Sequence, residues 1–428
     1  MNVKAFKLKG DTGIWIIVIF FALISIASVF SASSFLASEG GVAKTGIFLE
    51  QTRSVCFGFM ALFLCYLIPL RWYRALAFVV FGASVIMLIM LFIKPFRVEM
   101  NGAVRGLKVF GKTVQVFEIA KVGLILYLAR ALERWENDLD TFKDFYLKIA
   151  LPIFAVCLLV VPNSFSSALL FGGVSMMMLI FMDVKWKYIL SMVGVVVVAA
   201  GLYYGTYCAI FKGRTMDEGG VAAKMFNRIP TVEKRVARFF SDEEEIDFES
   251  MTKEEQKAYI DANRQTINAS VAISEGKIFG KGPGKSTQRY SLSMAFSDFI
   301  YAFIVEEYGL VGGIAVIVLY VTLLFRCIRL CTRCSTIFSG ALVIGISFLI
   351  ITQAMLHILV NVGLLPVTGH TLPLISHGGT AYLILSGAFG IILSVNKQLD
   401  KQDDEQRKRI ELEKQQIGNY NEETKGNY

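Results

Sequence analysis

The hydrophobic residues of this chain fall into blocks of about 20 residues, separated mostly by short polar segments. A helix of that length crosses a hydrocarbon core of about 30 Å. The blocks predict ten transmembrane helices, at roughly 14–36, 47–70, 74–93, 114–132, 145–161, 164–182, 187–210, 298–325, 337–361 and 375–396. We therefore expect an all-α fold, that of a polytopic integral membrane protein.

The composition agrees with this expectation, since 55% of the 428 residues are hydrophobic and 18% are charged. The first apolar block is too long for the core of a signal peptide, so we expect it to be retained as a helix. The net charge of +8 is ordinary for a membrane protein and gives no reason to expect a nucleic-acid partner.

Basic residues in the short loops predict the orientation, because Lys and Arg are enriched on the cytoplasmic side. Placing both termini in the cytoplasm puts most of these residues there. The loop between the third and fourth spans is the exception, and it would carry five basic residues on the outer side: Lys94, Arg97, Arg105, Lys108 and Lys112. These cations either bind a specific anionic partner or contact lipid phosphates.

One connection has domain-like length, the outer segment 211–297 between the seventh and eighth spans. Long segments of this kind are usually functional. Within it a capping box at 252–255 precedes apolar residues spaced among polar ones, which predicts an amphipathic helix on the membrane surface. We expect a membrane domain over 1–396, which includes the outer loop, and a charged cytoplasmic tail over 397–428 that is helical or disordered.

Asp298 stands at the start of the eighth span, directly after a glycine-rich polar segment. Ionisable residues near membrane depth are costly and are functional by default. Glu306 and Glu307 follow about 12–14 Å deeper along the helix, so we expect this span to line a wet cavity. The plain alternative for Asp298 is a helix cap, which leaves the two glutamates unexplained.

Polar residues in other spans offer partners for these carboxylates. Glu118 and Lys121 lie three residues apart on one face of the fourth span. Gln353, His357 and Asn361 follow at intervals of four along the ninth span. Such residues either converge on a site or hydrogen-bond one helix to another.

The glycine-rich segment from Gly280 to Ser286 ends like a phosphate-binding P-loop, but the pattern needs a glycine where Phe279 stands. A nucleotide site is therefore not expected. The glycines with Lys281 and Lys285 either bind a phosphate or form a tight turn that uses positive φ.

No spacing of histidines or carboxylates predicts a dedicated metal site, and no cofactor is evident. A loosely held Mg²⁺ or Mn²⁺ between a carboxylate and substrate phosphates would leave no motif. Cys327, Cys331 and Cys334 have a spacing that suits a metal, but no histidine lies nearby in the sequence. We expect free thiols, because the cytoplasm is reducing.

Three blocks of the chain resemble motifs of the SEDS family (shape, elongation, division, sporulation), which is named for FtsW and RodA. Within 101–121 the chain is similar to NGARRW…QPSEFAK, and within 280–310 it is similar to GxGxGxSxQ…HSDFIFA…EELGL. Residues 361–379 resemble NxGLLPxxGxxLPFxSYGG. Together with the ten spans and the large outer loop before the eighth, the resemblance covers about residues 10–396.

The resemblance implies an enzyme, a peptidoglycan glycosyltransferase that polymerises lipid II into glycan strands during cell-wall synthesis. It also implies the bacterial cytoplasmic (inner) membrane as the location. The implied partners are a class B penicillin-binding protein, which crosslinks the strands, and other division proteins. The charged tail favours the division type, acting at the septum, over the elongation type.

The resemblance further implies a catalytic residue and a substrate-binding set. Asp298 matches the aspartate that acts as the general base. The substrate-binding residues expected are Arg105, Glu118, Lys121, Gln265, Lys285, Ser286, Gln288, Glu306, Ser376, His377, Gly378 and Gly379.

The chain departs from the family pattern at five places. Phe296 replaces a histidine, and Ser293-Met294 replace a Pro-Glu pair. His377 replaces a tyrosine, and Gly106 replaces a tryptophan. The acidic residue of PDLGTA is absent within 162–168. Asp298 itself is intact, but the chain lacks the histidine two residues before it that a proton relay would use.

Two other functions fit the same pattern. A lipid II flippase also needs a wet polar cavity among ten helices, but it would depend less on one carboxylate at the outer rim. A scaffold that recruits division proteins would rely on the cytoplasmic tail and would tolerate replacement of Asp298.

Overall fold

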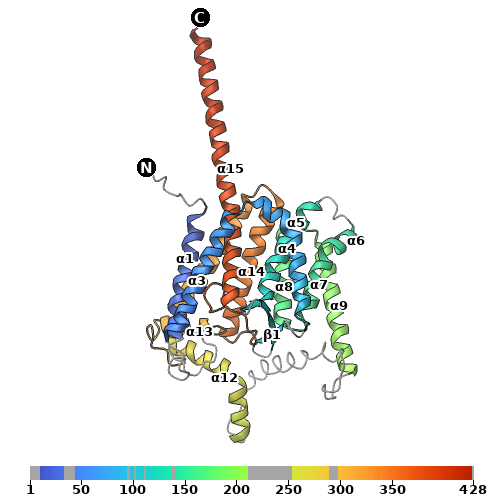
Figure 1. The fold of residues 1–428 in the computed structure, drawn as a ribbon, viewed down its shortest axis with the longest axis vertical. Coiled ribbons are helices and arrows are strands. Elements are labelled where there is room, and N and C mark those ends of the chain that lie inside the picture. Colours follow the sequence, from blue (N-terminus) through green and yellow to red (C-terminus); the bar gives the residue numbers. More distant parts are fainter. Residues whose placement is uncertain are drawn as a thin grey trace.

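The computed structural model of the protein describes residues 10–32, 44–93, 97–100, 103–109, 112–136, 141–210, 253–288 and 297–426. Helical segments lie at all ten predicted spans (Figure 1). They are α1 (Thr12–Ala32), α3 (Lys44–Leu67), α4 (Leu70–Met90), α5 (Val116–Arg134), α6–η2–α7 (Phe142–Phe145, Tyr146–Ala150 and Leu151–Val160), α8 (Phe165–Phe181), α9 (Trp186–Ile210), α13 (Ile300–Thr332), α14 (Ile337–Asn361) and α15 (Gly379–Gly426).

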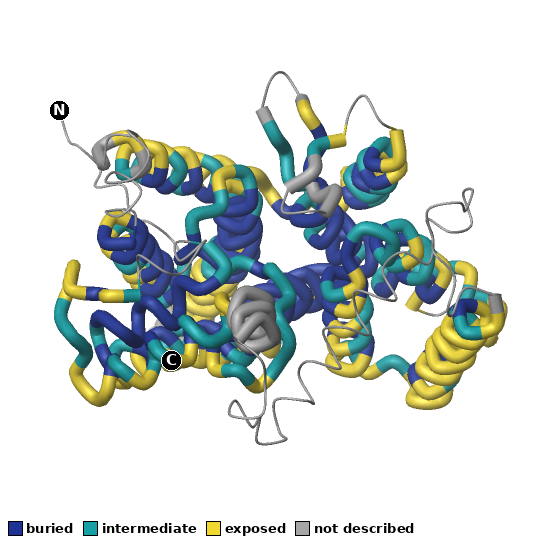
Figure 2. The backbone as a smooth tube through the Cα atoms, turned by 90° about the horizontal axis from the view of Figure 1, so that it is seen from below, coloured by how far each residue is buried: buried dark blue, intermediate teal, exposed yellow. Residues whose placement is uncertain are grey.

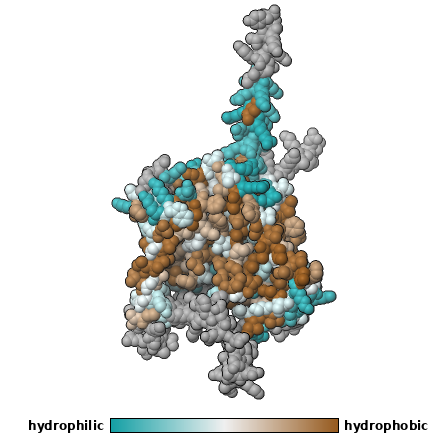
Figure 3. Space-filling view, turned by 180° about the vertical axis from the view of Figure 1, so that it is seen from behind, coloured by the Kyte–Doolittle hydropathy of each residue, from teal (hydrophilic) through white to brown (hydrophobic). Residues whose placement is uncertain are grey.

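Seven of the described helices are long and apolar enough to cross a membrane: α1, α3, α4, α9, α13, α14 and α15. Helix α8 is also apolar but shorter, at 17 residues. On the face shown in Figure 3, hydrophobic surface lies between more polar ends of the bundle. The prediction of an all-α, multi-pass membrane protein is therefore confirmed.

Helix α14 is the central element of the bundle, because it packs against α13, α5, α8 and α15 and is buried along most of its length. Helix α9 is the opposite case, since it lies at the edge and exposes most of its residues (Figure 2). Its apolar surface suits contact with lipid acyl chains.

The most extensive helix–helix interface joins α15 to α3, and glycines allow the two backbones to approach closely. A Cβ atom on Gly390 would lie 2.3 Å from the carbonyl oxygen of Leu62. A Cβ atom on Gly58 would lie 2.6 Å from the ring of Tyr382. Neither position has room for a side chain without a shift of its neighbours.

Ion pairs place the beginning of α1, the end of α13 and the middle of α15 at one end of the bundle. Arg326 contacts Asp11 at 2.5 Å, and Arg333 contacts Asp403 at 2.7 Å. The start of α1 lies at this end, and α15 continues well beyond the bundle (Figure 1). The charged segment after Asn396 is thus a continuation of the last helix as far as Gly426.

A small antiparallel sheet lies at the opposite end, in the basic loop between the third and fourth spans. Its strands pair in the order β1 (Arg97–Met100), β2 (Ala103–Val109) and β3 (Lys112–Gln115). The sequence did not predict this sheet. Strand β3 leads without a break into α5, which fixes the sheet to the start of that helix.

The amphipathic helix expected in the outer loop is present as α12 (Lys253–Gly276), at the same end as the sheet (Figure 1). Its small residues Ala269 and Ala272 pack against Phe299 and Ala302, so one face of the helix docks on the start of α13. Residues 211–252 lie outside the described part of the chain.

Candidate active site at the outer end of α13

Asp298 lies immediately before α13 and is half-buried. The helix cap is Phe299, so the alternative that Asp298 is a plain N-cap residue is wrong. Ser297 Oγ donates a hydrogen bond to Asp298 Oδ1 at 3.1 Å. The carboxylate is therefore held at the mouth of the helix and remains partly accessible.

Asn361, at the end of α14, holds the backbone from Asp298 into the first turn of α13. Its Nδ2 donates to the carbonyl oxygen of Asp298 at 3.2 Å, and its Oδ1 accepts from the amide of Ala302 at 3.0 Å. Nδ2 also donates to the carbonyl oxygen of His357 at 2.8 Å. One buried amide side chain thus joins α14 to the first turn of α13.

The loop before α15 reaches the same backbone through Ser376. Its Oγ donates to the carbonyl oxygen of Ser297 at 2.7 Å and accepts from the amide of Leu372 at 2.8 Å. The neighbouring His377 contacts Gln51 Oε1 through Nδ1 at 2.7 Å. Ser376 therefore contacts the backbone of the residue before Asp298, and His377 contacts α3.

The predicted pair in the fourth span is present and joins the polar stripe of α14. Lys121 Nζ contacts Glu118 Oε1 at 2.6 Å and Gln353 Oε1 at 2.7 Å, and both charged side chains are buried. Gln353 and Asn361 are eight residues apart, so this pair lies about 12 Å along α14 from the Asp298 contact. Glu118 Oε2 has no hydrogen-bond partner among the described residues.

Helix α13 is broken at Gly309, whose backbone has φ 70° and ψ −173°. The glycine-rich turn after α12 fills this break with backbone hydrogen bonds. Amides of Lys281 and Gly282 donate to the carbonyl oxygens of Glu306 and Glu307, each at 2.9 Å. On the other side of the break, the amides of Leu310 and Val311 donate to the carbonyl oxygens of Lys277 and Ile278. A broken helix is tolerated at membrane depth when other protein groups satisfy its backbone in this way.

The carboxylate of Glu306 anchors the following loop. Glu306 Oε1 accepts from the amides of Thr287 and Gln288, at 2.8 and 3.2 Å, and from Lys281 Nζ at 2.9 Å. Glu306 Oε2 accepts from Ser286 Oγ. Glu306 therefore holds Ser286 and the backbone amide of Gln288 in place.

Glu307 is bound from two sides, by Ser31 Oγ of α1 at 2.5 Å and by the amide of Gly284 at 2.8 Å. Both glutamates have 0% exposure. The expectation that they line a wet cavity is therefore wrong. They hold the glycine-rich loop to α13, and the sequence did not indicate the role of Ser31.

Lys281 is engaged with carboxylates, so the tight-turn interpretation of this segment fits better than a phosphate cradle built on Lys281. Its ammonium contacts Glu275 and Glu306. Hydrogen bonds from Lys281 and Thr287 lower the pKa of Glu275. Burial opposes the charge of Lys281, but hydrogen bonds to Glu275 and Glu306 outweigh it and raise the pKa of Lys281. Lys285, by contrast, is exposed.

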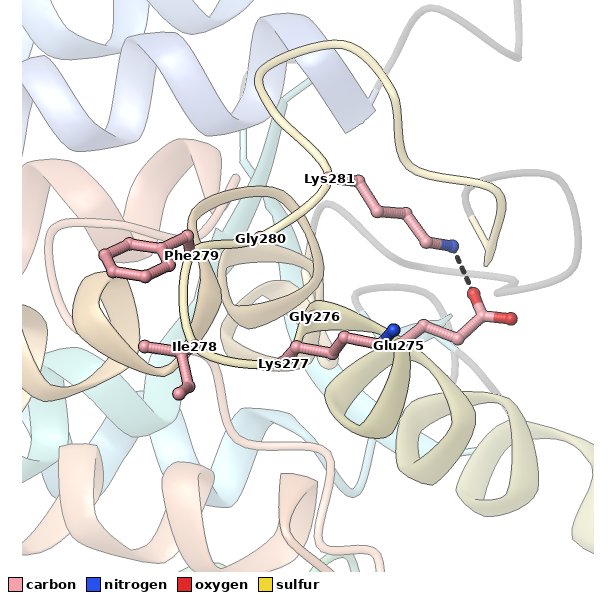
Figure 4. A pocket seen from close by; sticks show the side chains of 7 residues that line it. All are labelled: Glu275, Gly276, Lys277, Ile278, Phe279, Gly280 and Lys281. Carbon is pink, nitrogen blue, oxygen red and sulfur yellow. Dashed lines mark hydrogen bonds and ion pairs between the residues drawn. The ribbon is translucent and has the colours of Figure 1, made fainter.

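The turn from Glu275 to Lys281 borders an open cavity of about 630 Å³ (Figure 4). Figure 4 shows the Lys281–Glu275 pair on one side of the turn and Ile278 with Phe279 on the other. Phe279 is 82% exposed. The turn from Glu275 to Lys281 thus has a charged side and an apolar side.

Residues 11–401 match the family of cell cycle proteins that comprises FtsW, RodA and SpoVE. The chain belongs to this family. A probable peptidoglycan glycosyltransferase FtsW from Enterococcus hirae is 27% identical over 407 residues, which cover 94% of this chain and 95% of the relative.

Two solved structures share the fold. One is a chain of a peptidoglycan synthase complex in which polymerization and crosslinking are coordinated, with a TM-score of 0.67, 21% identity and coverage of 91% of this chain and 98% of that one. The other is the rod shape determining protein RodA of Thermus thermophilus, with a TM-score of 0.60, 21% identity and coverage of 91% and 98%.

Two departures from the FtsW/RodA/SpoVE pattern have visible structural counterparts. A Cβ atom on Gly106 would lie 2.5 Å from Thr113 Cγ2 across the sheet, so this backbone has no space for tryptophan without a shift. His377 keeps a hydrogen bond to α3 through Gln51. Phe296, Ser293 and Met294 lie outside the described residues.

Most of the expected substrate-binding residues, Arg105 and Gln265 among them, are not joined to Asp298 by any described contact. The backbone of Arg105 lies in β2, and its side chain falls outside the described part. Gln265 is exposed on α12, one turn before Ala269. Gly378 directly precedes α15 and Gly379 is its first residue. Thr380 Oγ1 accepts from the amide of Gln115 and so joins the sheet to this helix.

Within the described ranges, no three His, Cys, Asp or Glu residues gather in a way that could hold a metal ion. A weakly held divalent cation therefore stays a prediction from sequence. The three clustered cysteines are free thiols, and Cys331 and Cys334 contact the carbonyl oxygens of Gly340 and Leu330.

Proposed function

We propose that this protein is a peptidoglycan glycosyltransferase that polymerises lipid II into glycan strands, with Asp298 as the general base. The observation that carries the proposal is the position of Asp298. Its carboxylate is partly accessible at the mouth of α13, while Asn361 and Ser376 fix the backbone around it. A general base must be held within hydrogen-bond reach of the proton that it takes.

In the proposed reaction the 4-hydroxyl of the acceptor sugar attacks the anomeric carbon of the donor sugar. Asp298 takes the hydroxyl proton as the new glycosidic bond forms. The bond to undecaprenyl pyrophosphate breaks, and both bonding electrons leave with the pyrophosphate. Negative charge therefore develops on the leaving group and must be stabilised by cations.

Lys285 and Arg105 are the cations that we assign to the pyrophosphate. Lys285 is exposed on the loop that Glu306 holds, and Arg105 belongs to the basic sheet at the same end of the bundle. Lys121 is buried against Glu118, so we propose that its charge acts on the pyrophosphate electrostatically from inside the bundle and without direct contact. Gln265, Ser286, Gln288, His377, Gly378 and Gly379 complete the proposed substrate contacts, directly or through the loops that they shape.

We also propose that both termini are cytoplasmic and that α12 and the sheet face outward, where lipid II is polymerised. A class B penicillin-binding protein would then crosslink the strands. The FtsW name of the Enterococcus relative and the long charged end of α15 support a role at the division septum rather than in elongation.

The test uses purified protein, co-expressed with its cognate penicillin-binding protein and supplied with labelled lipid II. The expected product is a ladder of glycan strands on a gel. A verified complex that makes no strands, yet moves lipid II across liposome membranes, would overturn the proposal in favour of a flippase.

A further inference from the structure

A second polar cavity lies at the opposite end of the bundle from Asp298, the end at which α1 begins and from which α15 extends. Its volume is about 360 Å³, and α4, α5, α14 and α15 all contribute to its walls. The polar residues that line it are Arg71, Arg74, Arg130, Thr336 and Gln398. None of these residues takes part in the proposed glycosyl transfer.

The cavity carries excess positive charge. Arg74 Nε and Arg130 Nη1 both bond the same oxygen, Glu133 Oε2, each at 2.7 Å. One carboxylate therefore opposes three guanidinium groups. Each guanidinium has five N–H donors, so Glu133 orients two of them while most of their donors stay available.

Two helix N-termini add to this charge. Leu70, the first residue of α4, and Phe338, in the first turn of α14, both line the cavity. Neither helix has an acidic residue in its first turn, and α4 has no side-chain cap. The N-terminus of a helix attracts anions through its free amides and its dipole. The arginines and the N-termini of α4 and α14 thus line the same cavity. This arrangement of positive groups suits the binding of a phosphate.

The surroundings of the cavity indicate a lipid rather than a soluble anion. Trp72, beside Arg71, is 52% exposed, and Leu76 and Val79 on the next turns of α4 are 45% and 65% exposed. Trp is enriched where a bilayer meets water, and exposed apolar residues deeper along α4 would face acyl chains. A headgroup in the cavity would thus have its chains against α4.

We propose that this cavity binds the phosphate-bearing headgroup of an anionic phospholipid. The nearby carboxylates of Asp400 and Asp403 are taken by Arg333, so they do not neutralise the site. Basic pockets between transmembrane helices are a known way of holding such headgroups. The lipid would link the start of α4 to the start of α14.

Native mass spectrometry of the detergent-purified full chain tests the proposal by titration with phosphatidylglycerol, phosphatidylethanolamine or inorganic phosphate. Wild type should bind phosphatidylglycerol more tightly than phosphatidylethanolamine. Arg71→Gln should weaken phosphatidylglycerol binding about fivefold, while Arg71→Lys should weaken it less. Arg329→Gln is the matched control, because Arg329 is an exposed arginine at the same end that does not line the cavity.

Equal phosphatidylglycerol affinity in wild type, Arg71→Gln and Arg329→Gln would overturn the proposal. Displacement of the lipid by an equal concentration of inorganic phosphate would support a phosphate site but overturn its assignment to a lipid. Melting temperatures in lipid-free detergent would show whether each variant is folded. Arg71 is exposed and has no ion pair among the described residues, so Arg71→Gln should melt as wild type does.

Discussion

Gly280 and Gly309 face each other where the glycine-rich turn crosses the break in α13. A Cβ atom on Gly280 would lie 2.5 Å from the amide nitrogen of Gly309, and a Cβ atom on Gly309 would lie 2.4 Å from that of Gly280. Both residues have positive φ, 78° and 70°. Neither side of this crossing can carry a side chain, so the pair fixes how the loop sits on the helix.

Gly309→Ala is therefore expected to destabilise the protein by about 1–3 kcal/mol, because φ 70° with ψ −173° is a backbone conformation that essentially only glycine adopts, plus about 1–3 kcal/mol of steric overlap. Gly284→Ala is the matched control, because Gly284 also has positive φ, 76°, but nothing lies within 4 Å of its added Cβ. Thermal unfolding of both variants measures the difference. Equal losses would mean that the crossing of the two glycines is not tight.

Glu306→Gln should loosen the loop from Ser286 to Gln288, because the variant removes the charge that accepts from this loop and one of the two carboxylates that compensate Lys281. Breaking a buried ion pair costs about 3–5 kcal/mol. Because Lys281 is partly exposed, we expect a cost at or below the lower end of this range. Hydrogen exchange of the Thr287 and Gln288 amides should accelerate. Glu413→Gln, on the exposed part of α15, is the control and should leave their exchange unchanged.

Lys121→Met should destabilise the protein by about 3–5 kcal/mol, because it leaves Glu118 charged and buried without its partner. The double variant Glu118→Gln/Lys121→Met should regain much of that stability. If Lys121 also assists the leaving group, polymerisation should stay low in the double variant. Full recovery of both stability and activity would reduce the pair to a structural role.

The Glu275–Lys281 pair predicts a definite pH window. The pKa of Glu275 is lowered in the fold, so its contribution is present above its ordinary pKa of 4.5 and is lost as the pH falls through the lowered value. The pKa of Lys281 is raised, so its contribution is present below its ordinary 10.5 and is lost as the pH rises through the raised value. The difference in melting temperature between wild type and Glu275→Gln should be constant from about pH 6 to 9 and should shrink below about pH 4. A difference that grows on acidification would contradict this assignment.

The sequence was a good guide to the spans, because each is a continuous apolar block that the membrane requires. It did not predict the break in α13, because the groups that repair the backbone at Gly309 come from the turn at 277–282. The role of Glu306 was missed for the same reason. A costly carboxylate is visible in sequence, but its partner Lys281, 25 residues earlier, is not.

Contacts were predictable where one motif supplies them and not where distant segments meet. The Glu118–Lys121 pair follows from its spacing of three on one helix face. The contact of Ser376 with the backbone of Ser297 joins positions 79 apart, and that of His377 with Gln51 joins positions 326 apart. The small sheet was missed because its strands are short, with four, seven and four residues.

The most direct test of the account is the rate of lipid II polymerisation by Asp298→Asn, with lipid II binding measured separately. The complex with the penicillin-binding protein is used, and Ser297→Ala, which removes one hydrogen bond but keeps the carboxylate, is the control. We predict a loss of about 10²–10⁴-fold in rate for Asp298→Asn, the range for removal of a general base, with binding nearly unchanged. The control should lose far less. Polymerisation by Asp298→Asn at the wild-type rate would contradict the assignment of Asp298 as the base.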